Sequence, residues 1–151
     1  MSSASTATAP ETATEQVLLL ELAGRVYAVA SAVVREIVPT LPATRLPGAP
    51  PHVLGIMNLR GLLVTVVDPG PQLTGRPTRN LEGSTIVVQS GERLLGLRVD
   101  EVRDVQALEL TAAKGLPYES VGRGLVRGLG RLGDEVVIVL DVDRIVHETL
   151  A

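Results

Sequence analysis

Short apolar runs separated by turn-forming residues make up most of this chain. The runs cover residues 17–22, 26–30, 62–67, 85–89, 93–99, 102–110, 125–129 and 135–140. Apolar runs of this length, bounded by glycine and polar residues, are typical of β-strands rather than of long helices. Residues 23–25, 90–92 and 133–134 lie between neighbouring runs and predict three hairpins.

Two segments depart from the strand pattern. Residues 31–38 predict a short helical turn that leads into a strand, and residues 141–150 predict a terminal helix that Asp141 or Asp143 can cap. Segments rich in proline, glycine or polar residues, which predict loops or breaks, cover residues 39–51, 68–71 and 111–124. The whole pattern therefore indicates a mainly β protein, either a barrel or a sandwich.

One motif occurs twice in the chain. The first copy, Gly-Ile-Met-Asn-Leu-Arg-Gly-Leu-Leu-Val-Thr-Val-Val-Asp, covers residues 55–68, and the second, Gly-Leu-Gly-Arg-Leu-Gly-Asp-Glu-Val-Val-Ile-Val-Leu-Asp, covers residues 128–141. The offset is 73 at both ends, from 55 to 128 and from 68 to 141. Upstream, residues 25–37 resemble residues 93–105 at an offset of 68, from 25 to 93. Two copies favour a duplicated sheet or barrel unit over a solenoid.

The repeat predicts two related lobes behind an N-terminal tail. Residues 1–15 are small and polar without periodicity, so we expect a disordered tail there. The first lobe is expected at about residues 16–70 and the second at about residues 85–150, with a polar connection at about residues 71–84. A chain of 151 residues is long enough for two small subdomains that share a core.

Composition excludes several classes of function. The chain has no cysteine, which excludes disulfides, thiol nucleophiles and thiolate metal sites. Residues 1–15 lack the features of a signal peptide and no apolar run is long enough to span a bilayer, so a soluble, cytoplasmic protein without direct membrane insertion is expected. A net charge of −3, with no Phe or Trp and only two Tyr, disfavours nucleic-acid binding.

Two features suggest ligand chemistry only weakly. Residues 128–133 match the pattern GxGxxG, but a strand follows instead of the helix that a dinucleotide site requires, so the glycines are expected to serve a twisted strand and a turn. The two histidines, His52 and His147, lack metal-ligand spacing, so a zinc site needs carboxylates brought to them by the fold.

An acidic cluster is the third feature of this kind. Asp100, Glu101 and Asp104 lie close together in the sequence and suggest a metal or acid–base site. In the repeat, only Asp104 has an acidic counterpart, which is Glu36. A solvated strand end is therefore the favoured interpretation, and no catalytic residue is predicted.

Residues 58–61 (Asn-Leu-Arg-Gly) lie between two apolar runs, where a hairpin must reverse. Gly61 suits the positive φ that such a turn requires. Arg60 is then expected at an exposed tip beside Asn58. An ordinary solvated arginine is one interpretation, and an interface anchor that grips carboxylates or carbonyls is the other.

With these motifs, the chain resembles the CheW family, the adaptors of bacterial chemotaxis arrays, from about residue 16 to residue 150. The motifs that carry the resemblance are residues 34–37 (Val-Arg-Glu-Ile), residues 55–61 with the strand that follows to Asp68, residues 99–105 (Val-Asp-Glu-Val-Arg-Asp-Val) and residues 128–134 (Gly-Leu-Gly-Arg-Leu-Gly-Asp). Residues 68–71 (Asp-Pro-Gly-Pro) depart from the more helical continuation of the family, and the core is unusually poor in aromatic residues.

The resemblance implies two SH3-like five-stranded β-barrel subdomains around a shared apolar core, with no catalysis, metal or cofactor. It implies coupling between the cytoplasmic tip of chemoreceptors and the regulatory domain of a CheA-type histidine kinase, in membrane-associated arrays with ring contacts to other CheW-fold domains. The residues implied at partner contacts are Val34, Glu36, Gly55, Asn58, Arg60 and Gly61, with Gly96 and Val105 at the matching edge of the second lobe.

Two alternatives remain beside this adaptor role. One is a CheW-fold scaffold of a specialised motility or pilus pathway that binds no kinase. The other belongs to a different class and is a small ligand-binding or enzymatic β-barrel that uses Asp100, Glu101 and Asp104. Arg60 separates the classes, because reversing its charge is expected to impair partner binding in an adaptor and to leave an enzyme unaffected.

Overall fold

The computed structural model describes residues 12–39, 42–76, 83–112 and 124–150. The strands in these ranges are β1 (Thr12–Leu22), β2 (Arg25–Ala30), β3 (Val34–Pro39), β4 (Val53–Leu59), β5 (Leu62–Val67), β6 (Ser84–Ser90), β7 (Arg93–Val99), β8 (Glu101–Ala112), β9 (Val126–Leu132) and β10 (Glu135–Leu140). A short 3-10 helix, η1 (Ser31–Val33), and two α-helices, α2 (Gly70–Thr74) and α3 (Val142–Leu150), accompany them. The expectation of a mainly β protein is confirmed.

The local elements follow the sequence pattern closely. The three expected hairpins are β1–β2, β6–β7 and β9–β10, and the helical turn before a strand is η1 followed by β3. The terminal helix is α3, and Asp141 caps it by accepting a hydrogen bond from the backbone N–H of Arg144 at 3.0 Å.

Two boundaries were predicted wrongly. Strand β1 begins at Thr12 and pairs with β8 from its first residue, so residues 12–15 belong to a strand and not to the expected tail. Helix α2 begins at Gly70, directly after Asp68 and Pro69, where the sequence predicted only a break. A proline in the first turn of a helix is tolerated because its missing N–H has no partner there in any case. Residues 1–11 and 113–123, which hold the rest of the predicted tail and loop, lie outside the described residues.

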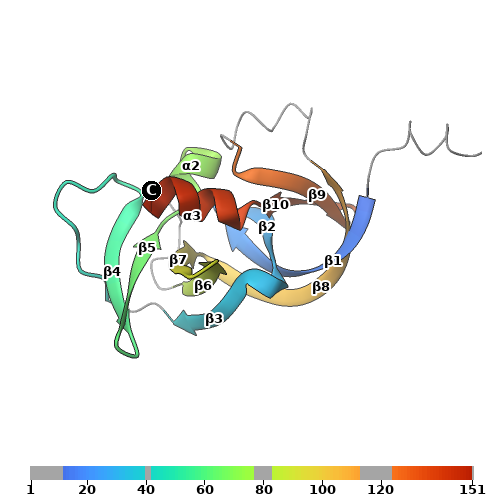
Figure 1. The fold of residues 1–151 in the computed structure, drawn as a ribbon. Helices are drawn as coiled ribbons and strands as arrows, with labels where there is room; N and C mark the ends of the chain where they lie inside the picture. The colour runs from blue at the N-terminus through green and yellow to red at the C-terminus, as the bar shows by residue number, and fades with distance from the viewer. Residues whose placement is uncertain (1–11, 40–41, 77–82, 113–123, 151) are drawn as a thin grey trace, which may run out of the picture.

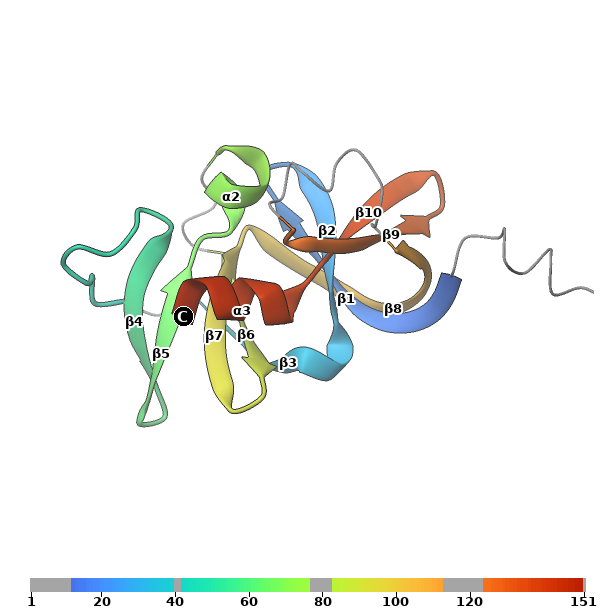
Figure 2. The same ribbon diagram turned by 45° about the horizontal axis from the view of Figure 1, so that its top comes forward.

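The strands form two sheets that lie side by side (Figure 1). Strands β1-β2-β10-β9-β8 make a closed barrel, and strands β3-β6-β7-β5-β4 make a second sheet, which a bridge between Thr44 and Ile56 extends beyond β4. Helix α3 packs between the two, as the second view also shows (Figure 2). The expectation of two SH3-like five-stranded subdomains and a short C-terminal helix is confirmed.

The sequence repeat is visible in the strand pairing. In the second sheet, β5 runs parallel to β7 and Val66 pairs with Gly96; in the closed barrel, β10 runs parallel to β2 and Val139 pairs with Ala28. The offsets of 73 and 68 that relate the repeats map one pair onto the other. The parallel pair of strands in one sheet therefore has a counterpart in the other.

The expected division of the chain into two consecutive lobes is contradicted by this pairing. The second sheet is built from β3 to β7, whereas the closed barrel combines β1 and β2 with β8, β9 and β10. The hairpin β1–β2 pairs with strands from the other repeat, along β8 on one side and β10 on the other. The repeat shows which segments are equivalent but carries no information on which copy each segment pairs with.

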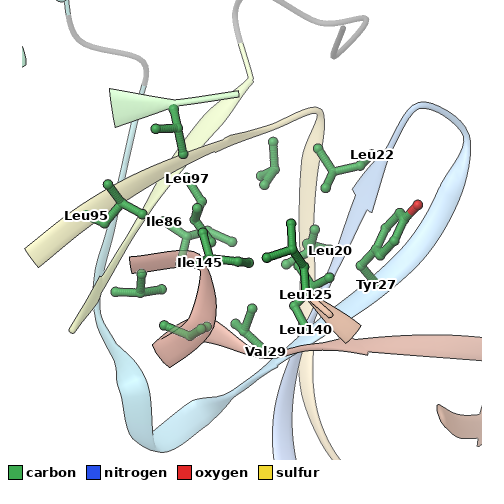
Figure 3. Packing of buried hydrophobic residues seen from close by; sticks show 14 of the residues in the cluster. Leu20, Leu22, Tyr27, Val29, Ile86, Leu95, Leu97, Leu125, Leu140 and Ile145 are labelled. Atoms are coloured by element: carbon green, nitrogen blue, oxygen red, sulfur yellow. The ribbon is translucent and has the colours of Figure 1, made fainter. Parts of the chain in front are cut away.

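Among the residues that the structure describes, buried side chains form three apolar clusters. One cluster fills the closed barrel and includes Val17, Leu19 and Val139. A second cluster lines the second sheet and includes Met57 and Val66. The largest lies between the two sheets (Figure 3), and its labelled members come from β1, β2, β6, β7, β10 and α3 together with residue 125. The shared apolar core expected from the sequence is thus confirmed, and we refer to this largest cluster as the shared core.

Because Tyr27 is buried, the stability of this core is expected to decrease at alkaline pH. Its ring lies in the shared core with the hydroxyl directed away from the other labelled side chains (Figure 3), and the residue is 2% exposed. Burial raises the pKa of the phenol, and the charge of Arg25 opposes this rise only in part. The phenol of the unfolded chain ionises first, at about pH 10, so stability is complete below that pH and falls as pH rises towards the folded-state pKa.

We therefore expect Tyr27→Phe to reduce the loss of stability under alkaline conditions. The measurement is the urea midpoint of each protein, by circular dichroism, at about pH 8 and about pH 11. The wild-type midpoint is expected to fall further between these two pH values than the midpoint of the variant. An equal fall in both proteins would show that other groups set the alkaline limit.

Candidate functional site

The turn between β4 and β5 presents Arg60 at an exposed tip. Leu59 pairs with Leu62, which leaves a two-residue loop, and both loop residues have positive φ, +53° at Arg60 and +87° at Gly61. Two positive φ values in a two-residue loop define a type I′ hairpin turn. Asn58 Oδ1 accepts a hydrogen bond of 2.8 Å from the backbone N–H of Gly61, which fixes the turn. The expected positive φ of Gly61 is confirmed, and that of Arg60 was not foreseen.

An ion pair joins this turn to β3. Arg60 Nη1 lies 3.0 Å from Glu36 Oε1, and the side chains are 81% and 20% exposed. Glu36 Oε1 is itself buried and has no hydrogen bond from the described residues, so the arginine supplies its main electrostatic compensation. The structure thus brings together Glu36, Asn58, Arg60 and Gly61, four of the residues implied by the family resemblance.

Large apolar side chains are exposed on the same two elements. Leu62 and Leu63 on β5 are 54% and 73% exposed, and Ile37 on β3 is 45% exposed. The hairpin projects beyond the body of the second sheet, so both of its faces are accessible at the tip (Figures 1 and 2). The sequence predicted Leu62 and Leu63 as part of a buried strand, which is wrong for these two positions. We call Glu36, Ile37, Asn58, Arg60, Leu62 and Leu63 the hairpin surface.

The other implied residues lie elsewhere. Gly55 is buried at the opposite end of β4, where the loop residue Thr44 packs on it. Gly96 is buried in β7, and Val34 is half-buried at the start of β3. Val105 is 54% exposed but belongs to β8 of the closed barrel. Gly55 and Gly96 therefore affect a partner only by positioning the elements around them.

The closed barrel carries a counterpart of the hairpin surface. By the repeat, Val105 corresponds to Ile37, and Val136, which is 52% exposed, corresponds to Leu63. We call Val105 and Val136 the counterpart surface. The repeat relates Ile37 and Leu63 to these two valines, and all four residues are apolar. Once one of the two surfaces is known to be exposed, the sequence therefore identifies the other.

The charges near the two surfaces differ. Arg60 corresponds to Gly133, so the counterpart surface lacks the arginine of the turn. Instead Arg103 on β8 lies 2.8 Å from Glu21 and 3.8 Å from Glu135. The hydrogen bond to Glu21 is the main cause that raises the pKa of Arg103. Similar apolar positions with different charges suit contacts with different partners.

The residues of the proposed enzymatic alternative do not converge. Asp100 Oδ2 accepts a 2.8 Å hydrogen bond from the backbone N–H of Ala23, so this side chain fixes the β1–β2 turn. Glu101 and Asp104 are exposed on β8. Within the described ranges, no three acidic or histidine side chains are placed to hold a metal ion.

The histidines and the glycine motif have structural surroundings. The carbonyl oxygen of His52 accepts the backbone N–H of Asp68 at 2.7 Å, and His147 is exposed on α3. The GxGxxG residues lie in β9 and in the turn before β10, as the sequence predicted. None of the helices that the structure describes is both long and apolar enough to cross a membrane.

Comparisons with known proteins agree on one family. The family model of the CheW-like domain matches residues 16–150. The chain is 28% identical over 140 residues to the "Chemotaxis protein CheW" of Klebsiella aerogenes. The aligned region covers 91% of this chain and 84% of that protein. It is 32% identical over 117 residues to the protein of the same name from Rhizobium meliloti, with 74% of each chain covered.

A solved structure has the same fold. The crystal structure of scaffolding protein TtCheW from Thermoanaerobacter tengcongensis superposes with a TM-score of 0.76, at 22% identity. The match covers 85% of this chain and 90% of that chain. It therefore extends over both sheets and is not confined to one of them.

Proposed function

Because the chain belongs to the CheW-like family, we propose that it is a non-catalytic adaptor that couples chemoreceptors to a CheA-type histidine kinase. The observation that carries the proposal is the hairpin surface, where Arg60 stands 81% exposed beside exposed leucines. An exposed guanidinium can grip carboxylates or carbonyls of a partner, and apolar neighbours exclude water from such a contact.

The partner proposed for this surface is the regulatory domain of the kinase or the cytoplasmic tip of a chemoreceptor. A contact of on the order of 1,000 Å² with one buried anchor corresponds to roughly micromolar affinity, or about −8 kcal/mol. Weak contacts of this kind become firm assemblies when many are linked. The protein is then cytoplasmic and is recruited to membrane-associated receptor arrays.

The counterpart surface supports a second contact. Val105 and Val136 are exposed in positions equivalent to Ile37 and Leu63, on the other lobe. One molecule can therefore join two neighbours through related but unequal surfaces, as the growth of a ring or array with other CheW-fold domains requires.

Calorimetric titration with the regulatory domain of a CheA-type kinase from the same organism tests the proposal. We expect roughly micromolar binding by the wild type and binding at least about tenfold weaker by Arg60→Glu. Arg60→Glu removes the cation beside the buried Oε1 of Glu36 and adds a second carboxylate there, so we expect a loss of about 1–3 kcal/mol in the free energy of unfolding. This is less than the total stability of about 5–15 kcal/mol of an ordinary domain, and the circular dichroism spectrum of the variant checks that it stays folded.

Arg45→Glu is the matched control for this experiment. Arg45 is an exposed arginine beside Thr44, which bridges to β4 far from the turn, and its reversal makes the same change in net charge. It is expected to bind like the wild type. Equal binding by Arg60→Glu would contradict the placement of the kinase on the hairpin surface, and no binding by the wild type would contradict the adaptor role and favour a kinase-independent scaffold.

A further inference from the structure

The two faces of β7 have different surroundings. Leu95 and Leu97 point into the shared core beside Ile145 (Figure 3), so the alternating residues Gly96 and Arg98 point to the inner face of the second sheet. A Cβ atom added to Gly96 would lie 2.9 Å from Cγ2 of Thr85, which places Thr85 on that inner face as well. Arg98 therefore lies on the apolar inner face of the second sheet and is buried.

Arg98 and Thr85 form a buried polar pair on this face. They are directly opposite each other in the β6–β7 ladder, and they are 8% and 0% exposed. Among the residues that the structure describes, neither Arg98 Nε nor Thr85 Oγ1 has a hydrogen-bond partner. A buried donor without an acceptor is unfavourable, so an additional group that accepts hydrogen bonds from Arg98 Nε and Thr85 Oγ1 would stabilise this site.

The closed barrel shows that the fold does not require polar residues here. At an offset of 68 in the sequence repeat, Thr85 corresponds to Val17, and Arg98 corresponds to Ala30. Val17 and Ala30 are paired in the β1–β2 ladder in the same way. The polar pair is therefore specific to the second sheet.

We propose that Arg98 and Thr85 bind a small carboxylate or phosphate anion where β6 begins and β7 ends. The planar guanidinium presents parallel N–H donors that match two oxygens of such a group, and the threonine hydroxyl adds a further donor. The site is separate from the hairpin surface, at the other end of the second sheet, and does not depend on the adaptor role.

Thermal unfolding of the full chain tests this site. Melting temperatures are measured in acetate, in succinate and in phosphate, against chloride at the same ionic strength. An anion present at about ten times its Kd is expected to raise the melting temperature by about 3–5 °C over chloride. A rise with the carboxylates alone or with phosphate alone identifies which anion the site prefers.

Two variants make the result specific. The double variant Thr85→Val with Arg98→Ala reproduces the Val17–Ala30 pair of the closed barrel and is expected to fold without responding to anions. Arg98→Lys keeps the charge but loses the planar fork, and we expect its affinity to be at least about tenfold lower. The proposal is overturned if no anion stabilises the wild type beyond chloride, or if either variant responds as the wild type does.

Discussion

Val66→Asp and Val139→Asp are each expected to unfold the protein. Both valines are 0% exposed, one inside the second sheet and the other inside the closed barrel. Each aspartate would be buried among the apolar side chains that line its sheet, where the cost is the desolvation of its charge. Thr85 and Arg98 lie on the same inner face as Val66, so the loss for Val66→Asp is expected to be the smaller of the two. The expected loss exceeds about 4 kcal/mol, against a total stability of about 5–15 kcal/mol for a domain of ordinary stability.

Exposed apolar residues on the same strands provide matched controls. Leu63→Asp on β5 and Val136→Asp on β10 introduce the same charge at positions that are 73% and 52% exposed. Both are expected to keep the circular dichroism spectrum and cooperative thermal transition of the wild type. A folded Val66→Asp or Val139→Asp would show that the lobe concerned can open to admit water.

Gly55→Ala is expected to be the most damaging of the conservative substitutions. Gly55 has φ of +145°, and a Cβ atom there would lie 2.3 Å from the carbonyl oxygen of Thr44. Thr44 exchanges two backbone hydrogen bonds of 2.8 Å with Ile56, so the clash would break the bridge that holds this loop to β4. Backbone strain and overpacking together correspond to a loss of about 2–5 kcal/mol in the free energy of unfolding.

Gly48→Ala separates the clash from the strain. Gly48 lies in the same loop with φ of +79°, but a Cβ atom there would meet no atom within 4 Å. Its substitution is expected to cost only about 1–2 kcal/mol, the strain of a left-handed residue. Urea unfolding of both variants measures the difference, and equal losses would contradict a steric role for Gly55.

Local structure was predictable because it depends on short-range patterns. The turn at Gly61 follows from a two-residue gap between strands, and the cap at Asp141 follows from an acidic residue before an amphipathic segment. The assembly of the lobes was not predictable in the same way. Equivalent hairpins in a duplicated chain can pair with either copy, and only contacts between residues far apart in sequence decide between them.

The candidate site was predicted in part for a related reason. Asn58 and Arg60 could be placed at a hairpin tip from the turn alone, and their contact with β3 through Glu36 agrees with the family resemblance. Gly96 could not be recognised as buried, because its environment is set by Thr85 and Val66 on neighbouring strands. Leu62 and Leu63 looked like core residues, since hydrophobicity does not reveal that a hairpin extends beyond its sheet.

The strands of the second sheet lie in the sequence between the two groups of strands that form the closed barrel, and this order has a consequence during synthesis. Strands β3 to β7 leave the ribosome as a continuous block, whereas β1 and β2 must wait for β8 to β10, the last strands to be made. In the meantime Val17 and Leu19, which pack inside the closed barrel, lack their final partners on β8 and β10. A nascent chain is therefore most prone to aggregate through its first hairpin, and it is protected only when the C-terminal third has emerged.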